Sequence, residues 1–264
     1  MIMNKTESYT ELSSQIMRNF RRGMLTNHFA AKDRLTRDIE KGLVYTAESE
    51  NGLLIITDRG THYYLHFYLH SPALVDEIPD TGSPIVLEIT KKNGDTSFGE
   101  AESSLNNRGF EHTFRRLRYS LSPSANTAPV NDRIRYASYD DLGNVMNLLH
   151  ESFSPLTGCI PSEAELLTDT EHILMITDSN KPSALLHYRE ERKSIEIRHL
   201  CTDANHRGQG LGSILVGEVA RIAGKESKKL TVWVREDYVP AQSVYKKYGF
   251  TPDGMISDVY IRHA

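Results

Sequence analysis

The chain has 264 residues, of which 39% are hydrophobic, and its formal net charge is −4. These values allow one large or two small domains and exclude a disordered chain. The slightly acidic balance lacks the basic excess of a nucleic-acid-binding protein or of a polybasic membrane anchor.

The sequence also argues against a membrane-spanning protein and against a metal site. No apolar run approaches the roughly 18 residues of a membrane-spanning helix, and the first residues have no signal-peptide core. The two cysteines, Cys159 and Cys201, are too few for a disulfide framework or a four-ligand zinc site. We therefore expect a cytoplasmic protein without a metal.

The first half of the chain mixes helical and strand-like segments. Apolar residues at helical spacing predict helices over residues 9–20, 31–42 and 101–107. Strand patterns predict strands over residues 43–48, 53–57, 61–69 and 85–89.

The strand at 61–69 places three histidines, His62, His66 and His70, on one face with two tyrosines. Three histidines in line suggest a metal site, but strand residues four apart are separated by about 13 Å, too far to share one ion. We therefore interpret this face as solvated and polar.

Residues 120–131 have the composition of a linker, with two prolines, three serines and two asparagines. We predict a domain over residues 1–122, a linker over 123–132 and a second domain over 133–264.

The second half mixes strands and helices, which predicts an α/β domain with a mixed sheet. Ser138 and Asp141 have capping-box spacing before a helix that begins near Leu142. Helices are predicted over 162–167, from 210 onward and over 241–248. Strands are predicted over 134–136, 172–177, 183–189, 194–202, 230–234 and 256–261.

A glycine-rich segment follows the predicted strand 194–202. Three alternate glycines, Gly208, Gly210 and Gly212, open an amphipathic helix. Glycines let the backbone approach a ligand closely, and a helix start offers unpaired N–H groups and a positive dipole end. The pattern indicates an anion cradle, most naturally for a pyrophosphate.

Other families build similar cradles. A P-loop ends in Gly-Lys-Ser/Thr, and Gly212-Ser213-Ile214 lacks the lysine. A dinucleotide fingerprint needs a glycine at its sixth position, which is Ser213 or Leu215 here, depending on the start. A glycine-rich loop without a ligand is the remaining alternative.

Two segments carry a family resemblance. The run 207–212, Arg-Gly-Gln-Gly-Leu-Gly, resembles the coenzyme A loop of the GNAT acetyltransferase superfamily, and 200–203 resembles the end of the family's fourth strand. The run 241–250 is similar to the family's Ala-x-x-x-Tyr-x-x-x-Gly-Phe helix and turn. The resemblance covers about 133–264 and implies a GNAT fold with acetyl-CoA as co-substrate.

The resemblance also implies roles for residues. Tyr245 matches a tyrosine that protonates the departing thiolate, although its helical apolar stripe also suits core packing. Glu196 matches a catalytic glutamate that acts as the base, directly or through water. The residues implied in acetyl-CoA binding are Leu200, Cys201, Thr202, Arg207, Gly208, Gln209, Gly210, Leu211, Gly212, Ser213 and Tyr238.

The base has competing interpretations. Strict strand alternation places Glu196, Arg198 and Leu200 on one face, so Glu196 can simply pair with Arg198. The same alternation places His199 on the opposite face with Ile195 and Ile197. His199 is the second candidate for the base because a histidine titrates near neutrality.

Two positions depart from the family pattern. Tyr238 stands where many members have an asparagine that contacts the coenzyme. Trp233 stands where members acting on protein N-termini often carry a glutamate, and an indole cannot accept a proton. Cys201 is not expected to form an acyl-enzyme, because direct transfer needs no covalent intermediate.

The first half repeats part of the second. A strand at 85–89, a helix at 101–107 and Gly109-Phe110 match the order of 230–234, 241–248 and Gly249-Phe250. This pattern suggests a tandem arrangement whose first, GNAT-like domain is degenerate and lacks a coenzyme loop. An unrelated small α+β domain is the alternative.

We therefore expect an N-acetyltransferase that moves an acetyl group from acetyl-CoA to the primary amine of a small molecule in a ternary complex. A protein lysine or N-terminal acetyltransferase is an alternative within the enzyme class. A non-catalytic CoA-binding sensor or interaction module is the alternative from another class. We expect a monomer or homodimer that binds neither nucleic acid nor membrane.

Overall fold

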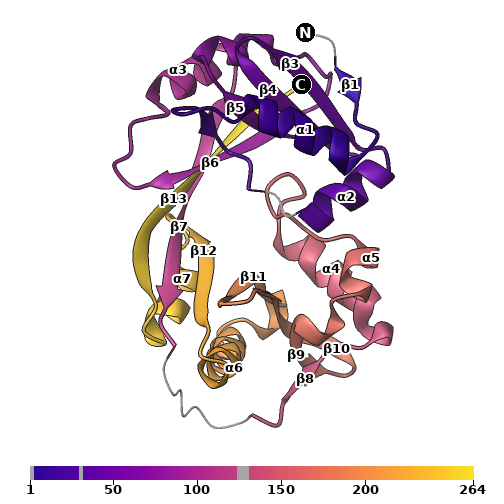
Figure 1. Cartoon of the computed structure of the whole chain (residues 1–264). Coiled ribbons are helices and arrows are strands. Elements are labelled where there is room, and N and C mark those ends of the chain that lie inside the picture. The colour runs from indigo at the N-terminus through magenta and orange to yellow at the C-terminus, as the bar shows by residue number, and fades with distance from the viewer. Residues whose placement is uncertain (1–2, 30–31, 124–130) are drawn as a thin grey trace. The chain divides into compact units, whose positions relative to one another are not determined.

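The computed structural model describes residues 3–29, 32–123 and 131–264. Its contacts divide the chain into two compact units (Figure 1). The first unit comprises Met1–Arg115 and Ile256–Ala264, and the second comprises Arg116–Met255. Each unit is described by itself.

The first unit is an α/β unit built on one sheet. Strands β3, β4 and β5 are antiparallel neighbours, and β5 pairs with β6 in parallel through Tyr63 and Tyr64. The strand order is β1-β3-β4-β5-β6-β13-β7. The elements that lie wholly in this unit are β1 (Asn4–Lys5), α1 (Tyr9–Asn19), β2 (Leu25–Thr26), α2 (Lys32–Glu40), β3 (Val44–Ser49), β4 (Gly52–Asp58), β5 (Tyr63–Leu69), the 3-10 helix η1 (Pro72–Glu77), β6 (Ile85–Lys92) and α3 (Gly99–Asn107).

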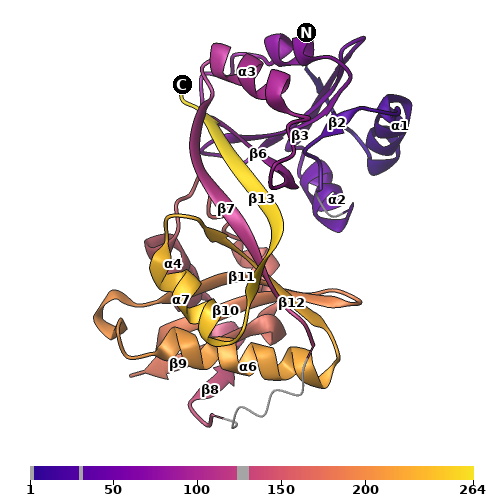
Figure 2. The same ribbon diagram turned by 90° about the vertical axis from the view of Figure 1, so that its left-hand side faces the viewer.

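Both faces of this sheet are buried, as alternation along β4 shows. Leu54 and Ile56 pack into a cluster with residues of η1 and α3, whereas Leu53 and Ile55 pack into a cluster under α1 and α2. Figure 2 shows α3 on one side of the sheet and α1 and α2 on the other. The first unit therefore has the layered arrangement of a helix-covered α/β sheet.

The interpretation of the β5 histidine face as solvated is wrong. His66 packs against His28, with ring centroids 4.9 Å apart, and its Nδ1 lies 3.4 Å from the Asn27 carbonyl oxygen. His28 Nδ1 lies 2.8 Å from the Tyr68 hydroxyl. Burial lowers the pKa of His66 to about 3 and that of His28 to about 4. The segment around β2 covers this face, and strand periodicity cannot reveal such a cover.

The second unit is also an α/β unit. Strands β9, β10 and β11 are antiparallel neighbours, and β11 pairs with β12 in parallel. The strand order is β13-β7-β12-β11-β10-β9-β8. The elements that lie wholly in this unit are β8 (Ile134–Tyr136), η2 (Tyr139–Asp141), α4 (Leu142–Ser152), α5 (Glu163–Leu167), η3 (Thr170–His172), β9 (Ile173–Asp178), β10 (Lys181–Glu190), β11 (Ser194–Thr202), η4 (Ala204–His206), α6 (Leu211–Lys225), β12 (Lys229–Arg235) and α7 (Val239–Lys247).

Two apolar clusters lie on opposite faces of this sheet. One holds Leu215 and Val219 of α6 against strands β9 to β12, and the other holds Val145 and Leu149 of α4 against β9 and β10. Figure 1 shows α6 and α4 on opposite sides of these strands. The predicted capping box is confirmed, because Ser138 and Asp141 form it before α4.

Two long strands contribute to both units. β7 runs from Glu111 to Leu121 and β13 from Thr251 to Arg262, so each crosses a division between the units. The predicted boundary at 123–132 differs from these divisions, and residues 124–130 lie outside the described residues. β7 was not predicted, because its five charged or histidine side chains mask its apolar alternation.

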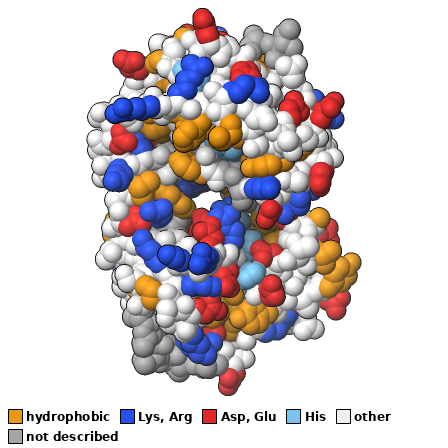
Figure 3. All heavy atoms as spheres, viewed as in Figure 1, with side chains coloured by type: hydrophobic (Ala, Val, Ile, Leu, Met, Phe, Trp, Pro, Cys, Tyr) orange, Lys and Arg blue, Asp and Glu red, His pale blue; other side chains and the backbone are white. Residues whose placement is uncertain are grey.

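Charge is distributed evenly over the face shown in Figure 3. Basic and acidic side chains are interspersed there, in keeping with 31 basic and 35 acidic residues in the chain. Among the described residues, no helix has the length and apolar character needed to cross a bilayer.

Candidate functional site

The site begins where two parallel strands separate. β11 pairs with β12 from Ser194 to Ile197, although β11 continues to Thr202 and β12 to Arg235. On its other edge β11 stays paired with β10 as far as Thr202. The β11 backbone beyond Ile197 is therefore open toward β12 and can hydrogen-bond to an extended ligand.

The glycine loop lies at the end of this opened strand. Gly208 and Gly210 have φ angles of +78° and +75°, and Gly210 is the N-cap of α6. A Cβ at either glycine would meet no atom within 4 Å. The positive φ requires glycine, and the free space leaves the first N–H groups of α6 accessible to an anion.

The other loop residues are held to the strand end. Arg207 Nε donates to the carbonyl oxygen of Thr202 at 3.4 Å. A Cβ at Gly212 would lie 3.7 Å from side-chain atoms of Leu200 and Thr202, which is ordinary contact. Gln209, Leu211 and Ser213 complete the predicted loop, and the Ser213 hydroxyl lies 3.1 Å from Lys247 Nζ.

Asp203 organises the turn between β11 and the loop. Its Oδ1 accepts hydrogen bonds from the Asn205 N–H and His206 Nδ1, each at 2.9 Å. These bonds lower the pKa of Asp203 and raise that of His206. The carboxylate thus caps the short helix η4 (Ala204–His206), which directs the chain into the glycine loop.

A bulge in β11 corrects the predicted assignment of faces. His187 pairs with His199 and Tyr188 with Ile197, so Arg198 is an extra residue in the strand. Ile195 and Ile197 consequently pack into the cluster of α6, whereas Cys201 packs into the cluster of α4. The prediction that His199 shares a face with Ile195 and Ile197 is wrong.

Glu196 lies on β11 just before the bulge. Its carboxylate oxygens lie 3.4 Å from guanidinium nitrogens of Arg189 and Arg198. Its side chain is 18% exposed. The predicted pairing with Arg198 is present, and both contacts are longer than typical charge-assisted hydrogen bonds.

His199 and Cys201 lie beyond the bulge and are buried. His199 Nε2 lies 2.9 Å from the Gly158 carbonyl oxygen and its Nδ1 lies 3.2 Å from His187 Nδ1. Burial lowers the pKa of His199 to about 3 and raises the pKa of the Cys201 thiol to about 12. Both ring nitrogens of His199 are engaged, which argues against its role as the base.

Tyr245 lies in the core between α6 and α7. Its ring is 4% exposed and packs against Phe250, with centroids 5.5 Å apart. Burial raises its pKa well above the usual range, so the phenol keeps its proton at neutral pH. Tyr238, the N-cap of α7, is 54% exposed and forms no side-chain cap hydrogen bond.

Gln242 was missed by sequence reasoning. Its Nε2 donates to the carbonyl oxygens of Arg235 at 3.1 Å and Glu236 at 2.8 Å, and its Oε1 accepts from the Tyr119 hydroxyl at 3.3 Å. The buried amide therefore fixes the loop between β12 and α7. No sequence signal marks it, because its partners are two backbone carbonyls and the distant Tyr119 hydroxyl, which only the folded chain brings together.

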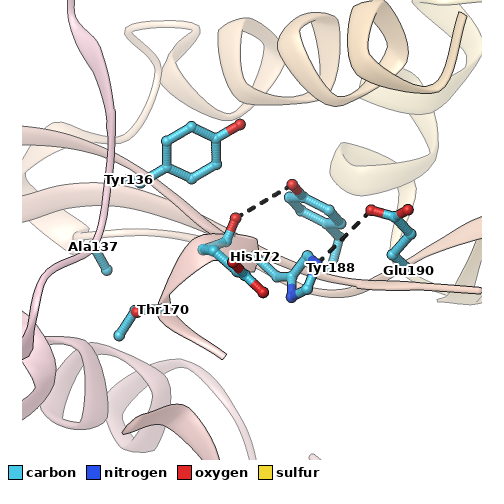
Figure 4. Close-up of a pocket in the computed structure, with 7 residues that line it drawn as sticks. Tyr136, Ala137, Thr170, His172, Tyr188 and Glu190 are labelled. Atoms are coloured by element: carbon cyan, nitrogen blue, oxygen red, sulfur yellow. Dashed lines mark hydrogen bonds and ion pairs between the residues drawn. The ribbon is translucent and has the colours of Figure 1, made fainter. Parts of the chain in front are cut away.

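A separate hollow of about 550 Å³ lies beside β8, η3 and β10. Figure 4 shows the rings of Tyr136 and Tyr188 in its wall, and His172 facing Glu190. His172 Nε2 lies 3.8 Å from a Glu190 carboxylate oxygen. None of the predicted site residues lines this hollow.

The arrangement places the glycine loop at the start of α6 beside an open strand edge, with Glu196 on β11 and Tyr245 on α7. Within the described residues, no group of three or more His, Cys, Asp or Glu side chains is placed to hold a metal ion.

Comparison with known proteins agrees with this geometry. Residues 142–250 match the family described as acetyltransferase (GNAT) family. A segment of 66 residues is 32% identical to a protein of Bacillus subtilis (strain 168) named as a candidate ribosomal protein bS18-alanine N-acetyltransferase. That segment is 25% of this chain and 44% of the relative, so the chain spans less than half of that protein's length.

Solved structures match nearly the whole chain. A tandem GNAT protein from the clavulanic acid biosynthesis pathway has a TM-score of 0.62 at 11% identity, over 99% of this chain and 98% of that one. A GNAT-family acetyltransferase from Colwellia psychrerythraea has a TM-score of 0.61 at 13% identity, over 100% of both chains. These likenesses concern the fold. Residues 142–250 form a domain of the acetyltransferase (GNAT) family, in a chain with the fold of a tandem GNAT protein.

Proposed function

We propose that this chain transfers an acetyl group from acetyl-CoA to the primary amine of a small molecule. The observation that carries the proposal is the glycine loop at the end of a strand whose parallel pairing has opened. The free space at Gly208 and Gly210 fits a pyrophosphate, because N–H groups at a helix start favour such an anion.

The backbone would hold the coenzyme. The N–H groups of residues 207–213 bind the pyrophosphate, and the open edge at Leu200, Cys201 and Thr202 pairs with the pantetheine amides. A strand N–H at this edge also polarises the thioester carbonyl as negative charge develops on its oxygen. Exposed Tyr238 would contact the coenzyme beside α7.

The reaction removes two protons from the substrate ammonium and places one on the CoA sulfur. Glu196 accepts the first proton, directly or through water, and the neutral nitrogen then attacks the thioester carbonyl carbon. The new C–N bond forms as the C–S bond breaks, and Tyr245 donates its proton to the departing CoA thiolate. The nitrogen gives up its second proton as the amide forms, and that proton passes through water to restore the Tyr245 phenol. The proton on Glu196 returns to solvent after the amide is released.

The first experiment measures CoA release over a panel of primary amines. We expect Glu196→Gln to lower kcat by about 100-fold for the best amine, because the amide cannot accept a proton. The thermal shift produced by acetyl-CoA should remain, because the glycine loop is unchanged. An unchanged kcat would remove Glu196 from the mechanism.

The same panel separates the classes of function. An acetyl-CoA-dependent rise in Tm without acetylation of any amine would favour a non-catalytic CoA-binding module. The absence of any thermal shift with acetyl-CoA or CoA would contradict both proposals.

A second candidate acceptor is the N-terminal amine of a protein. The name of the Bacillus subtilis relative favours it, whereas the indole of Trp233, which lies over Arg118 at 5.6 Å, supplies no proton acceptor. Peptides with an N-terminal alanine belong in the panel, and a kcat/KM for them above that of every small amine would establish this alternative. Cytoplasmic location and a monomeric or homodimeric state remain predictions.

A further inference from the structure

Two neighbouring backbone carbonyls in the loop after α4 accept hydrogen bonds from strands on the two sides of the gap between β11 and β12. Thr157 accepts a hydrogen bond from a guanidinium nitrogen of Arg116 at 2.6 Å. Gly158 accepts one from His199 Nε2 at 2.9 Å. Arg116 belongs to β7, where it is paired with Arg235 of β12, and His199 belongs to β11. Residues 157–158, here called the strap, therefore connect the strands on either side of the opening.

The strap has little freedom to take another path. A Cβ at Gly158 would lie 2.7 Å from both Phe153 Cβ and the Ser154 carbonyl oxygen. Cys159, which follows, has a φ angle of +49°, a left-handed conformation that is unfavourable for a residue with a side chain. Phe153 also packs edge-on against His199, with ring centroids 5.1 Å apart. The surrounding contacts enforce this conformation.

Behind His199 lies a chain of polar groups, of which His187 is buried and Asp169 and His172 are half-buried. His199 Nδ1 is 3.2 Å from His187 Nδ1, and the two rings are parallel within 9°. His187 Nε2 is 2.7 Å from Asp169 Oδ2. The Asp169 carboxylate also bonds His172 Nδ1 at 2.5 Å, and His172 lines the hollow of Figure 4. The chain thus runs from that hollow to the strap.

The acceptors at the two ends of this chain orient the two rings. The Gly158 carbonyl can only accept, so His199 donates from Nε2. The Asp169 carboxylate likewise accepts from His187 Nε2. The two Nδ1 atoms face each other between these anchors.

We propose that the Asp169–His187–His199 chain is a positioning device that holds the strap across the opening and so determines which acceptor amines reach the thioester. This proposal rests on the proposed acetyltransferase function. Burial lowers the pKa of His199, and the nearby guanidiniums of Arg198 and Arg116 lower it further.

A variant that lacks the hydrogen bonds of His199 tests the positioning role. His199→Phe keeps an aromatic ring against Phe153 and removes both hydrogen bonds. We expect the KM for the best amine to rise about tenfold, because the strap loses its β11 anchor, while the KM for acetyl-CoA changes by less than about twofold. His199→Gln retains an N–H donor and should restore the amine KM to within about threefold of wild type.

His66→Phe is the matched control. His66 is also a buried histidine that approaches a backbone carbonyl, at Asn27, but it lies in the first unit. It should leave the amine KM unchanged. Equal rises in both Phe variants, equal rises in both KM values for His199→Phe, or no rise at all would overturn the positioning role.

Two structural measurements remain informative even if no amine is acetylated. Amide hydrogen exchange should accelerate over residues 153–162 in His199→Phe and stay unchanged over 207–213. Long-range 1H–15N NMR should show a proton on Nε2 of both His187 and His199. Unchanged exchange at the strap, or a His199 ring without a proton on Nε2, would contradict the device, whereas absent acetylation in wild type would contradict only the proposed function.

Discussion

The two units repeat one order of elements but differ in the crossover that joins their parallel strands. Each has three antiparallel neighbours, β3-β4-β5 or β9-β10-β11, followed by a parallel strand, a helix and a Gly-Phe turn. The helix ends are alike in detail. The Phe110 N–H bonds the Leu105 carbonyl at 3.0 Å, and the Phe250 N–H bonds the Tyr245 carbonyl at 3.2 Å.

The two units differ in the segment that connects their parallel strands. From β5 to β6 the chain forms the short 3-10 helix η1, whereas from β11 to β12 it forms the glycine loop and the fifteen-residue helix α6. At the matching helix position, Leu105 stands in the first unit where Tyr245 stands in the second. The two sheets are alike, and the residues that we propose for acetyl transfer lie in the crossover and at positions where the second unit differs from the first.

The largest effect is expected from a substitution in the glycine loop of the β11–β12 crossover. Gly210→Val places a β-branched residue at φ +75° and directs methyl groups into the space proposed for the pyrophosphate. We expect kcat/KM for acetyl-CoA to fall by more than about 100-fold, since both backbone strain and lost anion contacts act there. Initial rates at varied acetyl-CoA measure it.

Gly82→Val is the control for that substitution. Gly82 lies in the first unit's crossover, has a φ angle of +63° and likewise has no atom within 4 Å of a Cβ. It should carry a similar strain of about 1–2 kcal/mol and leave the kinetics unchanged. A loss of acetyl-CoA binding in Gly82→Val equal to that in Gly210→Val would mean that strain alone explains both.

The next effect concerns the phenol of Tyr245, whose matching position in the first unit is Leu105. Tyr245→Phe removes the proton donor and keeps the ring packed against Phe250, so kcat should fall by about 10- to 100-fold with both KM values nearly unchanged. Tyr260→Phe, a buried tyrosine of the first unit, is the comparison variant. If Tyr245→Phe keeps full kcat, then Tyr245 serves only in packing.

Acid should destabilise the first unit through its buried histidines. The folded-state pKa values of His28 and His66 lie at about 4 and about 3, below the ordinary value of 6.5. Between these folded-state values and pH 6.5, the unfolded chain therefore binds more protons than the folded chain. The stabilising contribution of the two histidines is fully present above pH 6.5, and the free energy of unfolding falls as the pH is lowered. Each histidine contributes a slope of up to about 1.4 kcal/mol per pH unit.

Denaturant unfolding between pH 7 and pH 4 measures that slope. The double variant His28→Phe with His66→Phe should show a shallower dependence than wild type, because neither side chain can then take up a proton on unfolding. A dependence as steep as that of wild type would show that these histidines are not the source.

The smallest effect is expected from substitutions in the glycine turns that end α3 and α7. Gly109 and Gly249 have φ angles of +77° and +85°, and a Cβ at either would make only ordinary contacts. Gly109→Ala and Gly249→Ala should each cost about 1 kcal/mol of stability, since the left-handed conformation alone penalises alanine. Costs that differ by more than about twofold would show that the two turns are not equivalent.

Local patterns predicted most elements and the loop that defines the site. β11 over 194–202 is confirmed as predicted, and α6 begins at Leu211, directly after Gly210. Capping spacing and apolar periodicity are local, so they can be read in one chain. η1 was not predicted, because a short 3-10 helix has no periodic apolar pattern long enough to detect.

Local sequence patterns could not predict which side chains of β11 and β5 are buried on which face. Strict alternation fails at Arg198, since a bulge depends on how β10 pairs with β11 rather than on the residues of β11 alone. His66 is buried because residues around β2, some forty positions earlier, cover it. Pairing and covering are long-range events that a periodicity count does not contain.

The sequence by itself determined the glycine loop and its place between a strand and a helix, and its resemblance to a family implied the candidate pair Glu196 and Tyr245. Only the tertiary structure decided that β11 and β12 separate after Ile197, that β7 and β13 contribute to both units, and that Asp169, His187 and His199 form one chain. The physical reason is range. Glycine conformation and helix capping act over a few neighbouring residues, whereas strand pairing and buried hydrogen bonds join residues that are distant in the chain.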